Sequence, residues 1–218
     1  NFTLNNVTDI GTISQGTLGS SVVVPATVGG WKLLNRTAIS GSPTYVEFIN
    51  GTGGVVIDSS TYETYQFRIS GIGCGVDIMN VSINAGISSG YITASNYRVA
   101  GQENASGGGH NNRHSNSFNH MPLGWAGSSN AVDERPFLCT LDMSLKTGHM
   151  PVFGFNSAQF QDNNNFFYSI GGCVIIGSAY QSHNIDRIRF FYHGNYTSTS
   201  STTPQTWLNE GSIALYGL

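Results

Sequence analysis

The chain has 218 residues, of which 10% are charged and 39% are hydrophobic, and its formal net charge is -3. This composition excludes a disordered chain, which combines low hydrophobicity with high net charge, and the sparse Lys and Arg residues form no cluster that would bind nucleic acid. The longest apolar runs are far below the roughly 20 residues that span a bilayer, so we expect no membrane insertion.

A chain of this length fits one all-β domain. Segments rich in β-branched and aromatic residues recur along it, separated by clusters of Gly, Ser, Asn and Pro, which predicts a single antiparallel β-sandwich. Residues 1–30 are expected to form an N-terminal arm or first strand, and residues 31–218 the sandwich. Because the sequence does not begin with Met, we expect further residues upstream. The predicted strands are 44–49, 64–72, 76–84, 91–99, 137–145, 166–176, 185–193 and 212–218.

The segment 76–84 has the clearest alternation and predicts a central strand. One bulge would place Val76, Ile78, Val81 and Ile83 near the core.

Two glycine motifs flank this strand. Residues 71–75 superficially match a dinucleotide-binding loop, and residues 86–90 match the G-x-S-x-G nucleophile motif. Both motifs need a helix directly afterwards, whereas strand-like residues follow here, so we interpret them as a bend and a turn between strands.

Residues 101–130 are rich in Gly, Asn, Ser and His and are predicted to be a long surface loop, a common place for partner contacts. Residues 194–204 resemble an extended hairpin tip. Aromatic rings in such segments stack on sugars or anchor loops, and amides supply hydrogen bonds. The candidate ligand-binding residues are Trp125, Trp207, Tyr196, Asn111 and Asn112, with Trp31 and Tyr180 as further aromatic candidates.

His110, His114 and His120 are candidate metal ligands in the predicted loop. The neighbouring Gly and Asn residues make a chelating helix improbable there. The alternatives are solvated loop histidines, or one histidine from each subunit of a trimer around an ion on the axis. No other cofactor is expected.

The remaining reactive groups are scattered. Cys74, Cys139 and Cys173 are predicted to be buried free thiols, although a pair among them stays open. Asp186 is expected to form an ion pair at the strand surface with Arg187 or Arg189. No clustered carboxylates occur, but two acids distant in sequence can meet as a glycosidase pair.

The C-terminal region carries a resemblance. An I-R-F-type strand begins at Ile188, a Gly/Ser/Thr-rich segment follows from Gly194, and the chain ends in Leu215-Tyr216-Gly217-Leu218. This order is similar to a recurrent bacteriophage virion domain, and residues 30–34, 45–48, 62–67 and 95–97 extend the similarity. The resemblance implies a jelly-roll-like sandwich of tail-fibre, receptor-binding or head-decoration proteins, and it carries over no catalytic residue.

We therefore expect a non-enzymatic structural protein on the virion surface. The leading interpretation is a homotrimeric, fibre-type adhesion module that contacts other virion proteins and binds a host-surface glycan. The second is a capsid decoration protein that stabilises the phage head. The third, from another class, is a sandwich-fold glycosidase or lyase.

Overall fold

The computed structural model describes residues 30–72, 79–106, 109–126, 137–160, 166–193, 204–205 and 210–218. Residues Trp31–Leu218 belong to one compact unit. The arm or first strand expected for residues 1–30 lies outside the described residues, apart from Gly30. Among the helices of the described part, none is long and apolar enough to cross a membrane.

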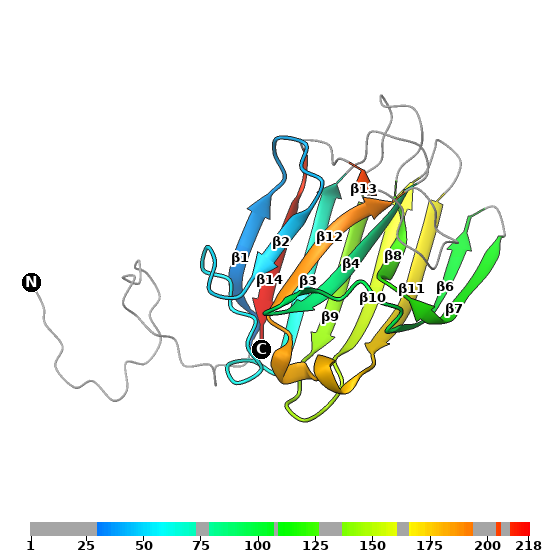
Figure 1. Ribbon diagram of the computed structural model, residues 1–218. Coiled ribbons are helices and arrows are strands. Elements are labelled where there is room, and N and C mark those ends of the chain that lie inside the picture. The colour runs from blue at the N-terminus through cyan, green and yellow to red at the C-terminus, as the bar shows by residue number, and fades with distance from the viewer. Residues whose placement is uncertain are drawn as a thin grey trace, which may run out of the picture. The chain divides into compact units, whose positions relative to one another are not determined.

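The fold is all-β, as predicted, and its two antiparallel sheets face each other as a β-sandwich (Figure 1). The large sheet has the order β1-β14-β3-β9-β10-β11-β6-β7. Its strands are β1 (Lys32–Ala38), β3 (Thr64–Ile72), β6 (Tyr97–Ala105), β7 (His110–Phe118), β9 (Phe137–Ser144), β10 (Val152–Phe160), β11 (Phe166–Ile175) and β14 (Ser212–Gly217).

The small sheet is built around two long strands, β12 and β4, which pair with each other. Strands β2 and β13 pair with β12, and strands β8 and β5 pair with β4. The bounds are β2 (Val46–Ile49), β4 (Met79–Ile87), β5 (Gly90–Tyr91), β8 (Met121–Ala126), β12 (Arg187–His193) and β13 (Pro204–Gln205). The described part adds only two short 3-10 helices, η1 (Ser178–Tyr180) and η2 (Ser182–Asn184).

Alternation along the strands creates the core between the sheets. In β9, every second residue from Phe137 to Met143 is buried, and the residues between them face outward. Phe48 and Phe190 of the small sheet meet Phe67 of the large sheet with edge contacts, the centroids being 5.2 Å from Phe67 in both cases. Further fully buried core residues are Tyr65, Ile72, Val81, Ile83, Ala85, Tyr97, Met121, Leu123, Leu141, Met143, Ile175, Ile188, Tyr192, Ile213 and Leu215.

Most strands that the sequence predicts are confirmed. Strand β3 has the predicted bounds, and β2, β9, β11, β12 and β14 end within two residues of theirs. Strand β4 lies in the middle of the small sheet, and Val81 and Ile83 are fully buried, as predicted. The earlier half of that prediction, with Val76 and Ile78, lies outside the described residues. Of the bulge or bend predicted at residues 71–75, only Gly71 and Ile72 are described, and the pairing of β3 with β9 shifts register there.

The predicted strand 91–99 is wrong in its middle. Of the predicted residues, Tyr91 belongs to β5 of the small sheet, and β6 of the large sheet starts at Tyr97. Between them, Thr93, Ala94 and Ser95 are exposed because the chain crosses from one sheet to the other. The G-x-S-x-G turn is confirmed, since β4 and β5 form a hairpin around Ser88 and Ser89.

The predicted loop over residues 101–130 is also wrong where the structure describes it. These residues complete β6 and supply β7 and β8, while residues 107–108 and 127–130 lie outside the described part. Strand β7 is at the edge of the large sheet, and ladder hydrogen bonds to β6 hold it there. A polar sequence forms a strand in this position because the backbone pairing does not need apolar side chains.

Candidate functional site

The outer face of the large sheet, turned away from the small sheet, is an open surface that extends over several strands. Residues in register across six strands form one row along it. The row consists of Asn112, Gln102, Ile170, Asn156, Thr140 and Arg68, from β7, β6, β11, β10, β9 and β3. At the usual strand spacing of about 4.8 Å, its five steps extend roughly 24 Å.

Large apolar side chains are exposed on this face. Leu138 is 49% exposed, Tyr168 39% and Ile170 47%. Leu138 and Tyr168 both lie opposite Ala158, a small residue on β10 between them. A shallow hollow of about 260 Å³ forms here, with Asn156 in its lining. The middle of the outer face therefore combines an aromatic ring, aliphatic side chains and an amide.

Two charged groups at one end of the outer face, Arg68 and Asp142, are linked through the amide of Gln66. The Arg68 guanidinium lies 4.8 Å from the centroid of the Tyr216 ring. Its Nε donates to Oε1 of Gln66 at 2.6 Å, and Nε2 of Gln66 donates to Oδ1 of Asp142 at 2.8 Å. This chain of contacts holds the side chains in place, and Arg68 also lines the hollow together with Asn156 and Tyr168.

The predicted ligand-binding residues are only partly placed by the structure. Asn112 is exposed on β7 and contributes to the outer face. Asn111 pairs with Glu103 in the β6–β7 ladder and Trp125 pairs with Asn80 in the β4–β8 ladder, but their side chains lie outside the described set. Tyr196 and Trp207 lie outside the described residues altogether.

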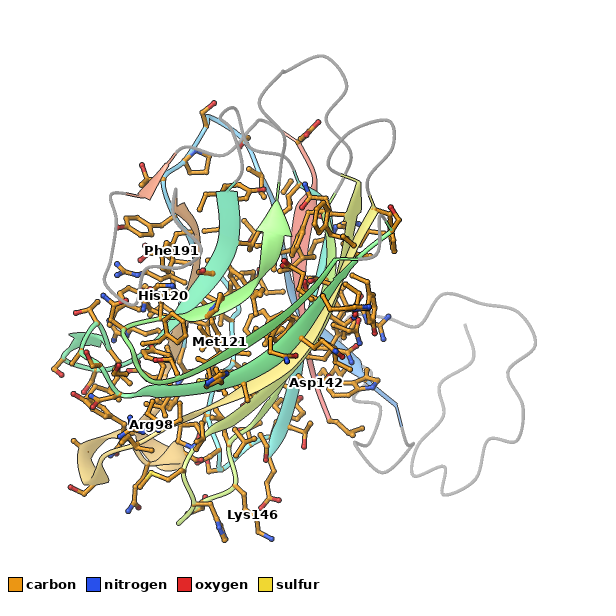
Figure 2. All side chains as sticks on the ribbon, turned by 90° about the vertical axis from the view of Figure 1, so that its right-hand side faces the viewer. Arg98, His120, Met121, Asp142, Lys146 and Phe191 are labelled. Atoms are coloured by element: carbon orange, nitrogen blue, oxygen red, sulfur yellow. The ribbon has the colours of Figure 1, made fainter. Side chains whose placement is uncertain are left out.

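The structure does not bring the three predicted metal ligands together. His110 and His114 are exposed on the outer side of β7, about 13 Å apart along the strand, and His110 Nδ1 lies 2.6 Å from Oδ1 of Asn104. His120 is 2% exposed and packs against Phe191, as Figure 2 shows. The described residues contain no group of three His, Cys, Asp or Glu that would hold an ion. A shared ion on a trimer axis stays a prediction.

The acids of the large sheet do not form a pair. Glu103 of β6 is 2% exposed on the inner side, where Ser169 Oγ donates to its Oε2 at 3.3 Å. Asp142 of β9 is exposed on the outer face, so the sheet separates the two carboxylates. The expected surface ion pair is present, since Arg187 Nε lies 2.7 Å from Oδ1 of Asp186.

Two of the predicted thiols are confirmed. Cys139 and Cys173 are free and buried, and burial raises the pKa of both above the ordinary value of a thiol. Cys74 lies outside the described residues. We therefore expect both described thiols to react slowly, because burial disfavours the thiolate, which is the nucleophile.

Tyr168, Ile170 and Leu138 are the site residues that sequence reasoning missed. All three belong to correctly predicted strands. For Tyr168 and Ile170, the sequence did not indicate which face of the sheet the side chains occupy. The inward-facing residue between them is a serine, Ser169, so neither face of β11 is purely apolar there.

Comparison with known proteins gives no relative of this chain. No family model, curated protein or solved structure matches it. The fold and the outer face therefore carry the functional interpretation.

Proposed function

We propose that the protein is a non-enzymatic structural protein on the surface of a bacteriophage virion, where it acts as a fibre-type adhesion module that binds a receptor glycan. The observation that carries this proposal is the outer face of the large sheet. It places an exposed ring, Tyr168, beside the amides of Asn156 and Gln102. Arg68, whose Nε donates to Gln66, lines the same hollow as Tyr168 and Asn156.

The chemistry of the outer face suits a neutral sugar chain. A phenol ring offers a flat apolar surface to the C–H groups of a pyranose, and side-chain amides exchange hydrogen bonds with hydroxyl groups. A rigid sheet holds these groups at fixed spacing, so little entropy is lost when a ligand binds. The resemblance of the C-terminal residues to phage virion domains supports the location, and a homotrimer with other virion proteins as partners belongs to the same proposal.

Binding to an array of bacterial surface glycans tests the adhesion role. We expect the wild-type protein to bind at least one glycan on the array. The Tyr168→Ala and Asn156→Ala variants are each expected to bind it at least about tenfold more weakly, corresponding to about 1.4 kcal/mol. Thr52→Ala is the matched control, since Thr52 is exposed in a loop away from this face. Equal binding by Tyr168→Ala and wild type would contradict the role of the outer face.

Head decoration is the second candidate, and exposed aliphatic residues favour it. Val152 is 52% exposed at one end of the outer face, and Leu138 and Ile170 lie farther along. Exposed apolar surface of this kind also suits a contact with another protein. The outer face would then pack against capsid subunits.

Labelling of intact particles separates the two candidates. Antibody against the protein, viewed by electron microscopy, marks fibres if the protein is an adhesin and the icosahedral shell if it is a decoration protein. Labelling of the shell, together with no binding to any glycan on the array, would contradict the adhesion proposal.

A further inference from the structure

Arg189 is the centre of a polar site on the outer side of the small sheet. It lies in β12, opposite Asn84 of β4 and Glu47 of β2. Its Nε and Nη2 both donate to Oδ1 of Asn84, at 3.1 and 3.0 Å. The guanidinium carbon lies 4.5 Å from the centroid of the Tyr45 ring and 4.3 Å from that of Tyr91. These contacts fix the cation in one orientation.

A second layer of contacts fixes Asn84. Its side chain is 3% exposed, and its Nδ2 donates to the carbonyl oxygens of Ile92 and Asn119, at 3.2 and 2.8 Å. The amide group therefore has only one orientation, with Oδ1 toward Arg189. Next to it, His120 packs its ring against Phe191 (Figure 2). The walls of the site are preorganised before any ligand arrives.

The Arg189 guanidinium has N–H groups that are not used by Asn84. Arginine carries five N–H groups, and two of them serve Asn84. Within the described residues, Arg189 forms no ion pair, and the small hollow beside it contains no carboxylate in its lining. The nearest acid is Glu47, which lies opposite Arg189 on β2 and whose carboxylate interacts with the hydroxyl group of Tyr91. Asn84, Thr93 and His120 line that hollow together with Arg189. A half-buried guanidinium with unused N–H groups is well placed to donate hydrogen bonds to the carboxylate of a ligand.

A larger hollow adjoins the first and shares Thr93 with it. Its volume is about 370 Å³, within the range of small-molecule sites. Tyr91 and Tyr180 line it, together with Ser89, and Tyr180 was already a candidate for stacking on a sugar ring. The two hollows thus place a cation next to aromatic rings and hydroxyl groups.

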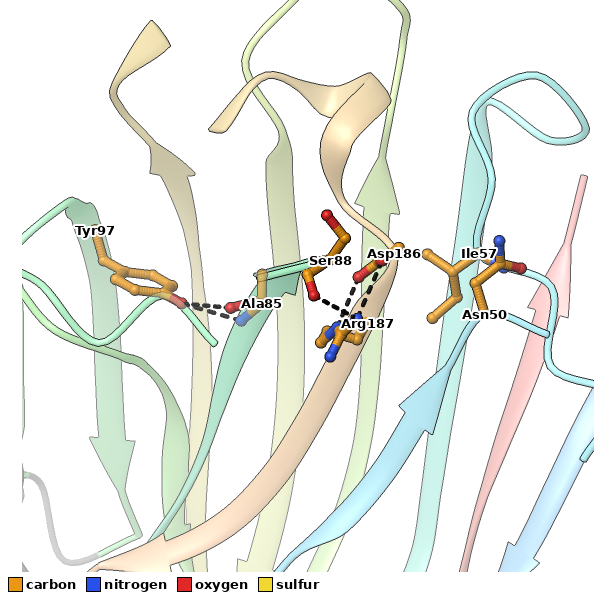
Figure 3. Close-up of polar contacts among 7 residues, drawn as sticks. All are labelled: Asn50, Ile57, Ala85, Ser88, Tyr97, Asp186 and Arg187. Atoms are coloured by element: carbon orange, nitrogen blue, oxygen red, sulfur yellow. Dashed lines mark hydrogen bonds and ion pairs between the residues drawn. The ribbon is translucent and has the colours of Figure 1, made fainter. Parts of the chain in front are cut away.

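The neighbouring arginine does not compete for the same ligand. Arg187 donates through Nε and Nη2 to the carboxylate of Asp186, at 2.7 and 3.2 Å, and it reaches the carbonyl oxygen of Ser88 (Figure 3). Its charge is therefore balanced within the protein, which leaves Arg189 as the cation open to a ligand at this place.

We propose that Arg189 and the adjoining hollow bind a hexuronic acid unit of an acidic glycan. The carboxylate accepts hydrogen bonds from the guanidinium, and the sugar ring contacts Tyr91 and Tyr180. The site lies on the small sheet, and the proposed neutral-glycan surface lies on the large sheet. The two proposals can therefore succeed or fail separately.

Titration of the full chain with monosaccharides, followed by NMR at low salt, tests the proposal. Glucuronate and galacturonate are expected to shift signals of residues around Arg189, while glucose and galactose bind at least about tenfold more weakly because they lack the carboxylate. Acetate is expected to bind more weakly than the uronates because it lacks the ring. No shift with either uronate, or equal binding of acetate, would overturn the proposal.

Variants locate the binding. Arg189→Gln is expected to lose uronate binding at least about tenfold, while Arg36→Gln keeps it. Arg36 is a control for the loss of one arginine, since it lies on β1 of the large sheet, where its Nε donates to the hydroxyl group of Ser212. If Arg189→Gln fails to fold, Tyr180→Ala replaces it, with a weaker uronate affinity as the expected result. Wild-type affinity in the folded variant would contradict the assignment.

Discussion

Two buried tyrosines tie irregular segments to the sheets through their hydroxyl groups. Tyr65 donates to the carbonyl oxygen of Asp58 at 2.8 Å and accepts from its amide at 2.7 Å. Tyr97 accepts from the amide of Ala85 at 3.0 Å and donates to the carbonyl oxygen of Ile92 at 3.0 Å. Figure 3 shows the Tyr97 contact with Ala85. Both phenols must stay protonated to donate these bonds.

The protein should lose stability in alkali because of these phenols. Burial raises the pKa of Tyr65 to about 12 and that of Tyr97 further, while an unfolded tyrosine has a pKa of about 10. Their contribution is complete below about pH 10 and is lost as the pH rises toward 12, because the unfolded state releases its protons first. Urea unfolding at increasing pH measures this fall. The unfolding free energy of Tyr65→Phe is expected to fall less steeply with pH than that of the wild type. An unchanged slope would contradict the explanation.

The two described thiols give a prediction about reactivity. In a Cys74→Ser background, Cys139 and Cys173 should resist a polar thiol reagent in the native protein and react fully after denaturation, since burial disfavours the thiolate. Counting modified thiols by mass spectrometry checks this. Rapid labelling of the native protein would show that this part of the sheet opens readily.

At the scale of the element, the sequence predicted a strand where one face was uniformly apolar. Strand β9 is such a case, with four buried side chains in alternation. Strand β10 was missed because Phe153 and Phe155 are followed on the same inner face by the buried polar residues Ser157 and Gln159. Strand β7 was missed because its segment is almost wholly polar. Whether such a segment forms a strand depends on the neighbouring strands that it pairs with, and the local sequence does not contain that information.

Two glycines in neighbouring strands should respond oppositely to alanine. A Cβ on Gly171 of β11 would lie 2.7 Å from the carbonyl oxygen of Ala100 and 2.8 Å from the Phe155 ring. A Cβ on Gly154 of β10 would meet nothing within 4 Å. Gly171→Ala should therefore cost about 1–3 kcal/mol of unfolding free energy, while Gly154→Ala should be neutral or stabilising by up to about 1 kcal/mol. Equal effects in denaturant unfolding would contradict this packing.

At the scale of the whole molecule, aromatic contacts between the sheets stabilise the sandwich. Phe67 packs against both Phe48 and Phe190 and is fully buried. Phe67→Ala should lower the free energy of unfolding by about 3–5 kcal/mol. Tyr168→Ala, on the exposed outer face, should change it by less than about 1 kcal/mol. Thermal or urea unfolding compares the two, and a small effect at Phe67 would mean that the sheets are held together elsewhere.

The candidate site was less predictable than the fold. Asn112 was chosen as a loop amide, and it reaches the outer face because β7 pairs with β6. Arg187 and Arg189 were both candidates for the ion pair with Asp186, and Arg187 forms it. Both surfaces combine residues from strands far apart in sequence, so only the pairing of the strands reveals them.

Strand β14, the last in this sequence, lies between β1 and β3, which are among the first. A ribosome that makes the chain from its N-terminus therefore releases β1 and β3 long before the strand that joins them exists. During that time the edge of β3 that β14 will occupy stays open to other unfinished chains. The large sheet closes only after residue 217 has emerged, so the yield of folded protein should depend on how well nascent chains are kept apart.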